Sequence, residues 1–270
     1  MVRIHLGSPV PAPDARGGSF LTGSTPVPAA TLILIRDRGP GDPFDLLMME
    51  RASTMAFAAG AMVFPGGRID RGDRADGGSP DAESDLPART AAIRETIEEV
   101  GIAVGLTPEP SADCVAQLRR ELAGGSAFRD LLADARLTID PGALTPFARW
   151  CPNFAETRSF DTLFFLARAP AGAEAQPDGS EAVSAAWASA ATFLADADAG
   201  RRHLIFPTRR TLERLATFPN FAAAVAQATA IPPRRITPWI EQRADGRWLC
   251  ISEDCGYPIT AERLDSAHRG

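Results

Sequence analysis

The sequence of 270 residues contains no lysine, so all 28 of its basic residues are arginines. This absence excludes a Schiff-base lysine, a P-loop lysine after a glycine run and a Ser-Lys dyad. Histidine is almost absent too, because His5 and His268 lie near the two ends and only His203 is internal. A Ser-His-Asp triad and a histidine-rich metal site are therefore disfavoured.

Cysteines and long apolar runs are also scarce. The four cysteines form no C-x-x-C pair and are too scattered for a disulfide framework. Residues 1–10 lack the uninterrupted apolar run of a signal peptide, and no stretch approaches the roughly 18 apolar residues that a membrane helix needs. These features predict a soluble, cytoplasmic protein with reduced cysteines and no membrane partner.

Carboxylates, by contrast, are plentiful. The chain has 34 acidic residues against 28 basic ones, which gives a net charge of −6 and an isoelectric point near 5.2. A negative balance argues against nucleic-acid binding through a basic field, because the phosphate backbone would be repelled. With 45% apolar residues the chain can still bury a large core. Carboxylates and arginines are therefore the side chains from which a site must be built.

The order of apolar runs and helical patterns predicts a single α+β domain with a mixed sheet. We expect residues 1–29 to form an irregular arm and residues 30–270 to form the domain, with a helical insertion at about 103–140 and a C-terminal extension. The acidic segment 70–86 is expected to be a loop. Strands are expected at 31–35, 44–49, 60–64, 145–150, 160–166 and 247–251, and helices at 88–100, 111–136, 182–197 and 208–230.

The expected helix at 88–100, which Gly101 is suited to end, carries three glutamates on one face. At about 100° per residue, Glu95, Glu98 and Glu99 share one side. The opposite side is apolar and contains Ile93, Ile97 and Val100. Like charges three or four residues apart destabilise a helix by a few tenths of a kcal/mol per pair, and a bound Mg²⁺ or Mn²⁺ would offset this cost. A solvated acidic face is the alternative interpretation.

Two neighbouring features favour a site over a solvated face. Arg94, beside the glutamates, can form charge-assisted hydrogen bonds to a carboxylate and fix its direction. Upstream, the expected strand at 60–64 runs into the sequence Phe64-Pro-Gly-Gly67. The glycines allow a tight turn and bring a backbone carbonyl, unobstructed by any Cβ, close to whatever the helix holds.

Together these segments resemble the box of the Nudix hydrolases, G-x5-E-x7-R-E-U-x-E-E-x-G-U, in which U is aliphatic. Residues 94–102 match its second half at every charged and glycine position, with Thr96 in place of an aliphatic residue. In the first half, Asp73 stands where the first glutamate is usual, and twenty residues rather than seven separate it from Arg94. The extra residues coincide with the acidic loop, so the spacing on the helix is preserved.

A second motif narrows the resemblance to one branch. Nudix enzymes that split coenzyme A carry the signature L-L-T-x-R-S/A-x3-R-x3-G-x3-F-P-G-G. Arg51, Ala52, Gly60 and the Phe64–Gly67 turn fall in its register, with Ala56 at the place of the second arginine. The signature and the insertion within the box are similar to those of the peroxisomal coenzyme A diphosphatase branch and its bacterial relatives.

The resemblance implies a Nudix-type α/β/α sandwich with extra helices and an inserted loop, which hydrolyses a diphosphate linked on both sides. It implies Mg²⁺ or Mn²⁺ as cofactor. The expected metal ligands are Glu95, Glu98, Glu99 and the Gly66 carbonyl, with Asp73 and Glu181 as further candidates. The expected catalytic residues are Glu98, Glu99 and Arg94, one glutamate orienting or deprotonating the attacking water. The expected substrate-binding residues are Arg51, Gly60, Phe64 and Gly67.

The expected substrate is coenzyme A or an acyl derivative, cut to adenosine 3′,5′-bisphosphate and (acyl-)4′-phosphopantetheine. One alternative keeps the site and changes the substrate to ADP-ribose, a dinucleotide or another nucleoside diphosphate derivative. A second alternative is a Nudix-like module that binds a nucleotide without catalysis. The three intact glutamates favour an enzyme, because they repel one another without a cation. The expected partner is thus a small molecule, neither nucleic acid nor membrane, and the oligomeric state stays open, with a homodimer as one option.

Overall fold

The computed structural model describes residues 25–39, 42–55, 57–74, 85–152 and 159–267, and its centre is a mixed sheet of eight strands. β1 and β8 run parallel over nine residue pairs, whereas β2 pairs antiparallel with β1, β3 and β9. The strands of this sheet are β1 (Val27–Arg36), β2 (Asp45–Arg51), β3 (Met62–Val63), β4 (Gly66–Arg68), β7 (Thr145–Trp150), β8 (Phe160–Arg168), β9 (Ala182–Ala188) and β10 (Arg235–Ile236).

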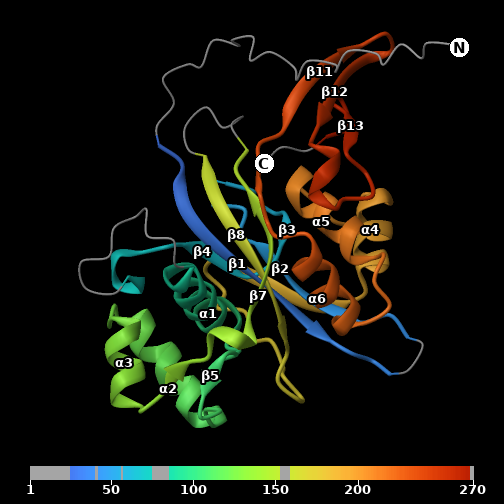
Figure 1. Ribbon diagram of the computed structural model, residues 1–270. Coiled ribbons are helices and arrows are strands. Elements are labelled where there is room, and N and C mark those ends of the chain that lie inside the picture. The colour runs from blue at the N-terminus through green and yellow to red at the C-terminus, as the bar shows by residue number, and fades with distance from the viewer. Residues whose placement is uncertain (1–24, 40–41, 56, 75–84, 153–158, 268–270) are drawn as a thin grey trace, which may run out of the picture.

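Helices cover both faces of this sheet, as Figure 1 shows. One face carries α1 (Leu86–Val100), α2 (Ala112–Ala123) and α3 (Phe128–Asp134), together with the small pair β5 (Leu106–Thr107) and β6 (Thr138–Ile139). The other face carries α4 (Ala190–Asp198), α5 (Phe206–Leu215) and α6 (Phe221–Ala230). Single 3-10 turns are η1 (Arg71–Asp73), η2 (Pro141–Ala143) and η3 (Glu253–Cys255). The mixed sheet and its two helical layers confirm the predicted α+β class.

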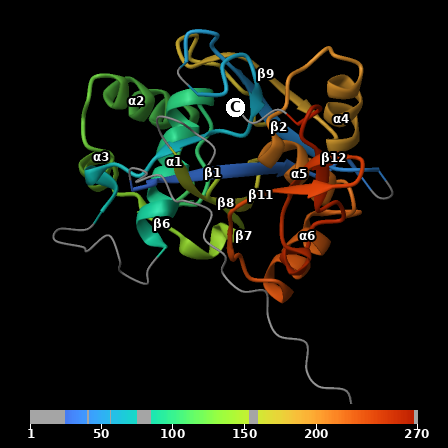
Figure 2. The ribbon, with the colours of Figure 1, turned by 90° about the horizontal axis from the view of Figure 1, so that it is seen from above.

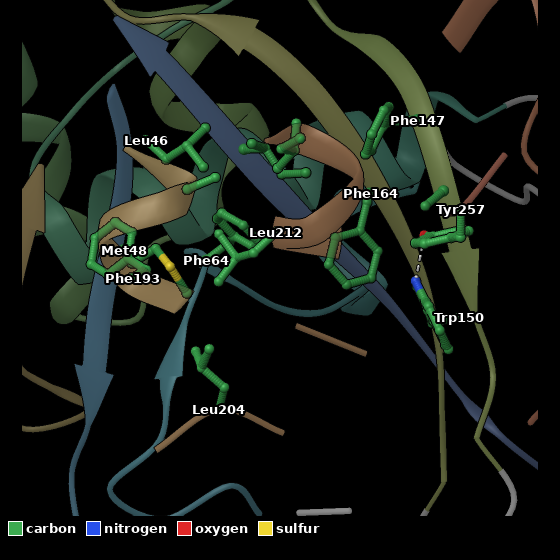
Figure 3. Packing of buried hydrophobic residues seen from close by; sticks show 14 of the residues in the cluster. Leu46, Met48, Phe64, Phe147, Trp150, Phe164, Phe193, Leu204, Leu212 and Tyr257 are labelled. Carbon is green, nitrogen blue, oxygen red and sulfur yellow. Dashed lines mark hydrogen bonds between the residues drawn. The ribbon is translucent and has the colours of Figure 1, made fainter. Parts of the chain in front are cut away.

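Strand alternation divides the buried side chains into two cores. In β1, Leu32 and Leu34 pack under α1, whereas Ile33 and Ile35 face the α4–α6 side. Burying each aliphatic side chain of this kind stabilises the fold by roughly 1.5–3 kcal/mol. On the α4–α6 side the indole of Trp150 donates a hydrogen bond of 2.9 Å to the Tyr257 hydroxyl within the apolar cluster that Figure 3 shows. The central sheet is therefore buried on both sides, which gives its strands the continuous apolar sequences from which they were predicted.

The C-terminal part of the chain adds a second sheet to the α4–α6 side. Its strands are β11 (Trp239–Arg243), β12 (Gly246–Cys250) and β13 (Ala261–Arg263), of which only the region of β12 was predicted. Figure 2 shows β11 and β12 beside α5 and away from α1–α3. Leu249 of β12 lies in the same apolar cluster as Leu212 of α5, so this extension shares the core of that face.

The structure corrects one helix and divides two others. The prediction of a helix at 182–197 is wrong, because the first part is strand β9, which pairs with β2, and helix α4 follows only after Ser189. Alanine favours helices, but pairing with a central strand outweighs that preference. The predicted helix at 111–136 is two helices separated at Gly124-Gly125, and the one at 208–230 is α5 and α6.

The described residues cover only part of the predicted arm and of the predicted acidic loop. Strand β1 begins at Val27, inside the segment 1–29 that was expected to be irregular, and residues 1–24 lie outside the described residues. Of the loop expected at 70–86, residues 75–84 also lie outside them. Within the described parts of the chain, no helix is both long and apolar enough to cross a membrane.

Candidate active site

Helix α1 carries the predicted glutamates and ends as its sequence indicates. Gly101 adopts a left-handed conformation with φ +69°, and its N–H bonds back to the Ile97 carbonyl. The apolar side of α1 contains Ile93, Ile97 and Val100, which pack against the sheet. This packing turns the opposite side of α1 towards the Pro-Gly-Gly turn, where Glu99 accepts a hydrogen bond of 2.8 Å from the N–H of Gly66.

The guanidinium of Arg94 donates hydrogen bonds to three carboxylates and to one backbone carbonyl. Its Nε and Nη2 each donate a hydrogen bond of 2.9 Å to the carboxylate of Asp73, and its Nη1 donates to Glu95 at 2.9 Å and to Glu98 at 2.8 Å. Its Nη2 also donates to the carbonyl of Arg68 at 3.0 Å. Burial by itself would lower the pKa of Arg94, but the hydrogen bond with Asp73 and the nearby glutamate charges raise it above its ordinary value. The guanidinium is thus a permanent charge that holds three carboxylates.

Asp73 lies at the first-glutamate position of the box and serves as the anchor of Arg94. It is the last residue of the 3-10 turn η1 and is 1% exposed. Besides the two bonds from Arg94, its Oδ2 accepts a hydrogen bond of 2.8 Å from the N–H of Asp70. The thirteen extra residues between Asp73 and Arg94 therefore do not separate the two side chains in space.

Glu99 is the most buried of the three glutamates. Its Oε2 accepts the hydrogen bond from Gly66, while its Oε1 is buried without a hydrogen-bond partner among the described residues. Nη1 of Arg51 lies 3.9 Å from that Oε1, and Nε of Arg51 is likewise buried and unpartnered among them. Burial, followed by the charge of Glu95, raises the pKa of Glu99 well above its ordinary value. Both side chains therefore retain unused hydrogen-bonding capacity.

Glu95 lies directly against the second glycine of the turn. A Cβ placed on Gly67 would be 2.4 Å from Oε1 of Glu95, so any larger residue here would displace this carboxylate. Burial raises the pKa of Glu95 to about 7, and the opposing attraction of Arg94 does not compensate. Burial also raises the pKa of Glu98, whose side chain is 30% exposed. The face of α1 is thus a partly buried cluster of carboxylates and not a solvated acidic face.

The loop before β9 brings Glu181 to this cluster. The N–H groups of Gln176 and Asp178 donate to the carbonyls of Val100 and Glu99 at the end of α1, at 2.9 and 3.0 Å. The charge of Glu181 is a minor contribution to the raised pKa values of Glu95 and Glu99. The carbonyl of Glu181 also accepts a hydrogen bond from the N–H of Ala52, directly after Arg51.

Two supporting residues were not identified from the sequence. The carboxylate of Asp178 accepts hydrogen bonds from the N–H groups of Glu181, at 3.0 Å, and Ala182, at 2.7 Å, which fixes the turn carrying Glu181. Its Asp-Gly-Ser sequence is a turn signal that could have indicated this role. Arg119 of α2 donates to the carbonyls of Glu98 and Glu99, at 3.0 and 3.3 Å. No local signal marks Arg119, because its partners are about twenty residues away.

The predicted substrate-binding residues occupy different positions. Gly60 has φ +67°, and its N–H donates to the carbonyl of Arg51 at 3.1 Å. Gly67 and Arg51 contact the carboxylate cluster as described above. The side chain of Phe64 is buried in the apolar core on the α4–α6 side of the sheet, where Figure 3 shows it near Leu212. Ala56, at the place of the second signature arginine, lies outside the described residues.

The carboxylate oxygens of this cluster are the type of ligand that a divalent cation prefers. In this structure, however, hydrogen bonds from Arg94 and Gly66 hold several of these oxygens. Among the described residues, no group of three or more His, Cys, Asp or Glu side chains lies close enough together to hold a metal ion. Arg94 draws Glu98 and one oxygen of Glu95 to itself, and Gly66 occupies one oxygen of Glu99. The orphaned Oε1 of Glu99 and the raised pKa values nevertheless mark carboxylates that lack sufficient positive charge.

Comparison with known proteins relates the chain to Nudix hydrolases. No family model matches the chain. A Nudix hydrolase structure from Alicyclobacillus acidocaldarius is 29% identical, with a TM-score of 0.64 over 75% of this chain and 96% of that one. The human acyl-coenzyme A diphosphatase NUDT19 is 27% identical over 204 residues, 56% of this chain and 54% of the human protein. The match thus spans about half the length of this curated relative.

In its fold, in the box on α1 and in these similarities the chain resembles the Nudix hydrolases. Among them it resembles the coenzyme A diphosphatase branch, in line with its sequence motifs.

Proposed function

We propose that the protein is a divalent-metal-dependent Nudix hydrolase that cleaves the diphosphate of coenzyme A or an acyl derivative. The products would be adenosine 3′,5′-bisphosphate and (acyl-)4′-phosphopantetheine. The observation that carries the proposal is the partly buried carboxylate cluster of α1, packed against the Gly66–Gly67 turn with Arg51 beside it. The similarity to a human acyl-coenzyme A diphosphatase supports the choice of substrate.

The residues that would hold Mg²⁺ or Mn²⁺ are Glu95, Glu98, Glu99 and Glu181, together with the carbonyl of Gly66. When bound, a divalent cation would neutralise charge on the two phosphates and polarise them for attack. Asp73 belongs to the site through Arg94, because both of its oxygens accept hydrogen bonds from that guanidinium.

The protein groups have separable tasks in this proposal. Glu98 or Glu99 orients or deprotonates the attacking water, because both combine a raised pKa with a place on the face that meets the turn. Arg94 fixes the directions of Glu95 and Glu98. Arg51, whose Nε has no partner among the described residues, donates to a substrate phosphate.

A second candidate keeps the site and changes the substrate to ADP-ribose, a dinucleotide or another nucleoside diphosphate derivative. Ala56 at the second arginine position of the coenzyme A signature favours this candidate. A non-catalytic module that binds a nucleotide is the third candidate. The buried, mutually repelling glutamates speak against it, because without a cation they only destabilise the fold.

A panel of diphosphates assayed with Mg²⁺ and with Mn²⁺ tests these candidates. The proposal expects hydrolysis of coenzyme A in preference to ADP-ribose and dinucleotides. Glu98→Gln is expected to lower kcat by about 100-fold or more, the range of a lost general base, whereas Glu121→Gln, an exposed glutamate of α2, serves as the matched control. A folded protein that hydrolyses none of the panel would contradict the enzyme, and full turnover by Glu98→Gln would contradict the role of that glutamate.

A further inference from the structure

A polar cleft of about 420 Å³ lies on the other side of strands β2 and β3 from the carboxylate cluster. One wall is formed by Glu50 of β2, by Gly60 in the segment before β3 and by Met62 of β3. The segment 201–203, between α4 and α5, lines the other and contributes two arginines and a histidine. A volume of this size is typical of small-molecule sites, and the polar lining indicates a charged or hydroxylated ligand.

The two arginines of the cleft are held in place with donors to spare. Asp196 accepts from Nη2 of Arg201 at 2.6 Å and lies 3.6 Å from Nε of Arg202. Nη1 of Arg202 donates to the thioether sulfur of Met62 at 3.0 Å, and sulfur is a weak acceptor. The side chains of Arg201 and Arg202 are 62% and 30% exposed. A phosphate oxygen would therefore be a better partner for Nη1 of Arg202 than the one it has.

Glu50 adds a carboxylate, which accepts hydrogen bonds, to the lining of the cleft. Its Oε2 accepts a hydrogen bond of 3.0 Å from the Ser184 hydroxyl of β9. An ionised carboxylate has several acceptor sites and no donor, so it can also accept from the hydroxyl of a sugar. Arginines facing a glutamate across one cleft thus suit a ligand that carries a phosphate next to a hydroxyl.

The cleft is adjacent to the candidate active site along the chain. Glu50 and Arg51 are successive residues of β2, so their side chains lie on opposite faces of the sheet. The N–H of Gly60 donates to the Arg51 carbonyl, and the N–H of Met62 donates to the carbonyl of His203 at 2.8 Å. Arg51 and the cleft therefore lie on opposite faces of the sheet at the same end of β2, so a ligand that meets both has to pass round that end.

We propose that this cleft binds a phosphorylated ribose, with Arg201 and Arg202 on a phosphomonoester and Glu50 on the neighbouring hydroxyl. This proposal rests on the proposed function and specifies which of its candidate substrates the protein prefers. Coenzyme A carries a 3′-phosphomonoester on the ribose beside its diphosphate, whereas ADP-ribose carries none. The segment between α4 and α5 thus selects the substrate, although it contributes nothing to the carboxylate cluster.

Binding tests the cleft without turnover. Calorimetric titration compares adenosine 3′,5′-bisphosphate with adenosine 5′-monophosphate, which differ only in the 3′-phosphate. We expect the bisphosphate to bind about tenfold more tightly to the wild-type protein, in line with one charge-assisted hydrogen bond, and Arg202→Gln to abolish the difference. Arg168→Gln is the matched control, because it removes one charge from a surface arginine that pairs with Asp37 away from the cleft. Equal affinities in the wild-type protein, or an equal loss for both ligands in Arg202→Gln, would overturn the proposal.

Kinetics separates this proposal from the proposed function. If coenzyme A is hydrolysed, Arg202→Gln should raise its KM about tenfold at nearly constant kcat and leave the KM of dephospho-coenzyme A unchanged. A wild-type protein that hydrolyses neither compound would refute the proposed function, while the two adenosine ligands would still decide the cleft. Thermal melting verifies the fold, and if Arg202→Gln is unfolded, Arg201→Gln takes its place with the same expected loss of the difference.

Discussion

The pH dependence of stability in the metal-free protein follows from the environment of Glu95. Burial raises the pKa of this carboxyl to about 7, from an ordinary value of 4.5. Folding therefore favours the protonated form, and its stabilising effect is fully present below pH 4.5 and is lost as the pH rises through 7. Each pKa unit corresponds to about 1.4 kcal/mol, so ionised Glu95 lowers the free energy of unfolding by about 3 kcal/mol.

The variant Glu95→Gln isolates this contribution. The amide that replaces the carboxyl stays neutral at every pH and keeps an oxygen that can accept the hydrogen bond from Arg94. Between about pH 5 and pH 8 the wild-type protein should lose about 2.5 kcal/mol relative to the variant, most of the full penalty. Because a change of 1 kcal/mol shifts the melting temperature of a chain this large by roughly 2–4 °C, the two melting curves should move apart by about 5–10 °C.

Thermal melting in the presence of a chelator, at several pH values, measures this difference. The comparison removes the effects of other groups common to both proteins. One is Asp161, whose pKa burial alone would raise but the hydrogen bond from Arg149 lowers. Mg²⁺ should reverse the trend by binding the ionised carboxylates, so it should stabilise the wild-type protein more at about pH 8 than at pH 5. A constant difference between wild type and variant across this pH range would refute the burial of Glu95.

Two substitutions test the contacts around Arg94 and the glycine turn. Gly67→Ala should lower activity about 100-fold, as expected for a misplaced reacting group, with little change in melting temperature, because the added Cβ meets only the flexible end of Glu95. Gly66→Ala should instead destabilise the fold, since its Cβ would lie 2.4 Å from a backbone oxygen; equal melting temperatures for the two variants would contradict this distinction. Asp73→Asn should cost about 1.5–3 kcal/mol in urea unfolding, because it removes one of two charge-assisted hydrogen bonds while Arg94 stays paired with Glu95 and Glu98, and a loss below about 0.5 kcal/mol would show that the pair is not needed.

Much of the candidate site could be predicted because it is local. Glu95, Glu98 and Glu99 lie within one and a half turns of helix, so the helical period alone places them on one face. Gly101 ends that helix because only glycine adopts the left-handed conformation there without strain. The strands β1, β2, β7 and β8 were also predictable, since their apolar runs reflect burial on both faces of the sheet.

What could not be predicted depends on contacts between distant segments. The segment of β9 is rich in alanine and reads as a helix, and only its pairing with β2 makes it a strand. Arg119 reaches the end of α1 from a helix of its own, and nothing in its neighbourhood indicates that partner. Phe64 belongs to the coenzyme A signature, but its side chain is part of the core on the α4–α6 side.

The sequence by itself determined helix α1, its spacing of carboxylates and the glycine turn, because periodicity and backbone freedom act over a few residues. The absence of lysine likewise leaves arginines as the long basic side chains from which any site in this chain is built. Only the tertiary structure decided how the charges are balanced. It brings Asp73 to Arg94 across the insertion and brings the charge of Glu181 to bear on Glu99. It also places Arg202 in the cleft that Glu50 lines. Burial and long-range contacts determine the pKa values and the partners of these charged groups, and a short sequence pattern predicts neither.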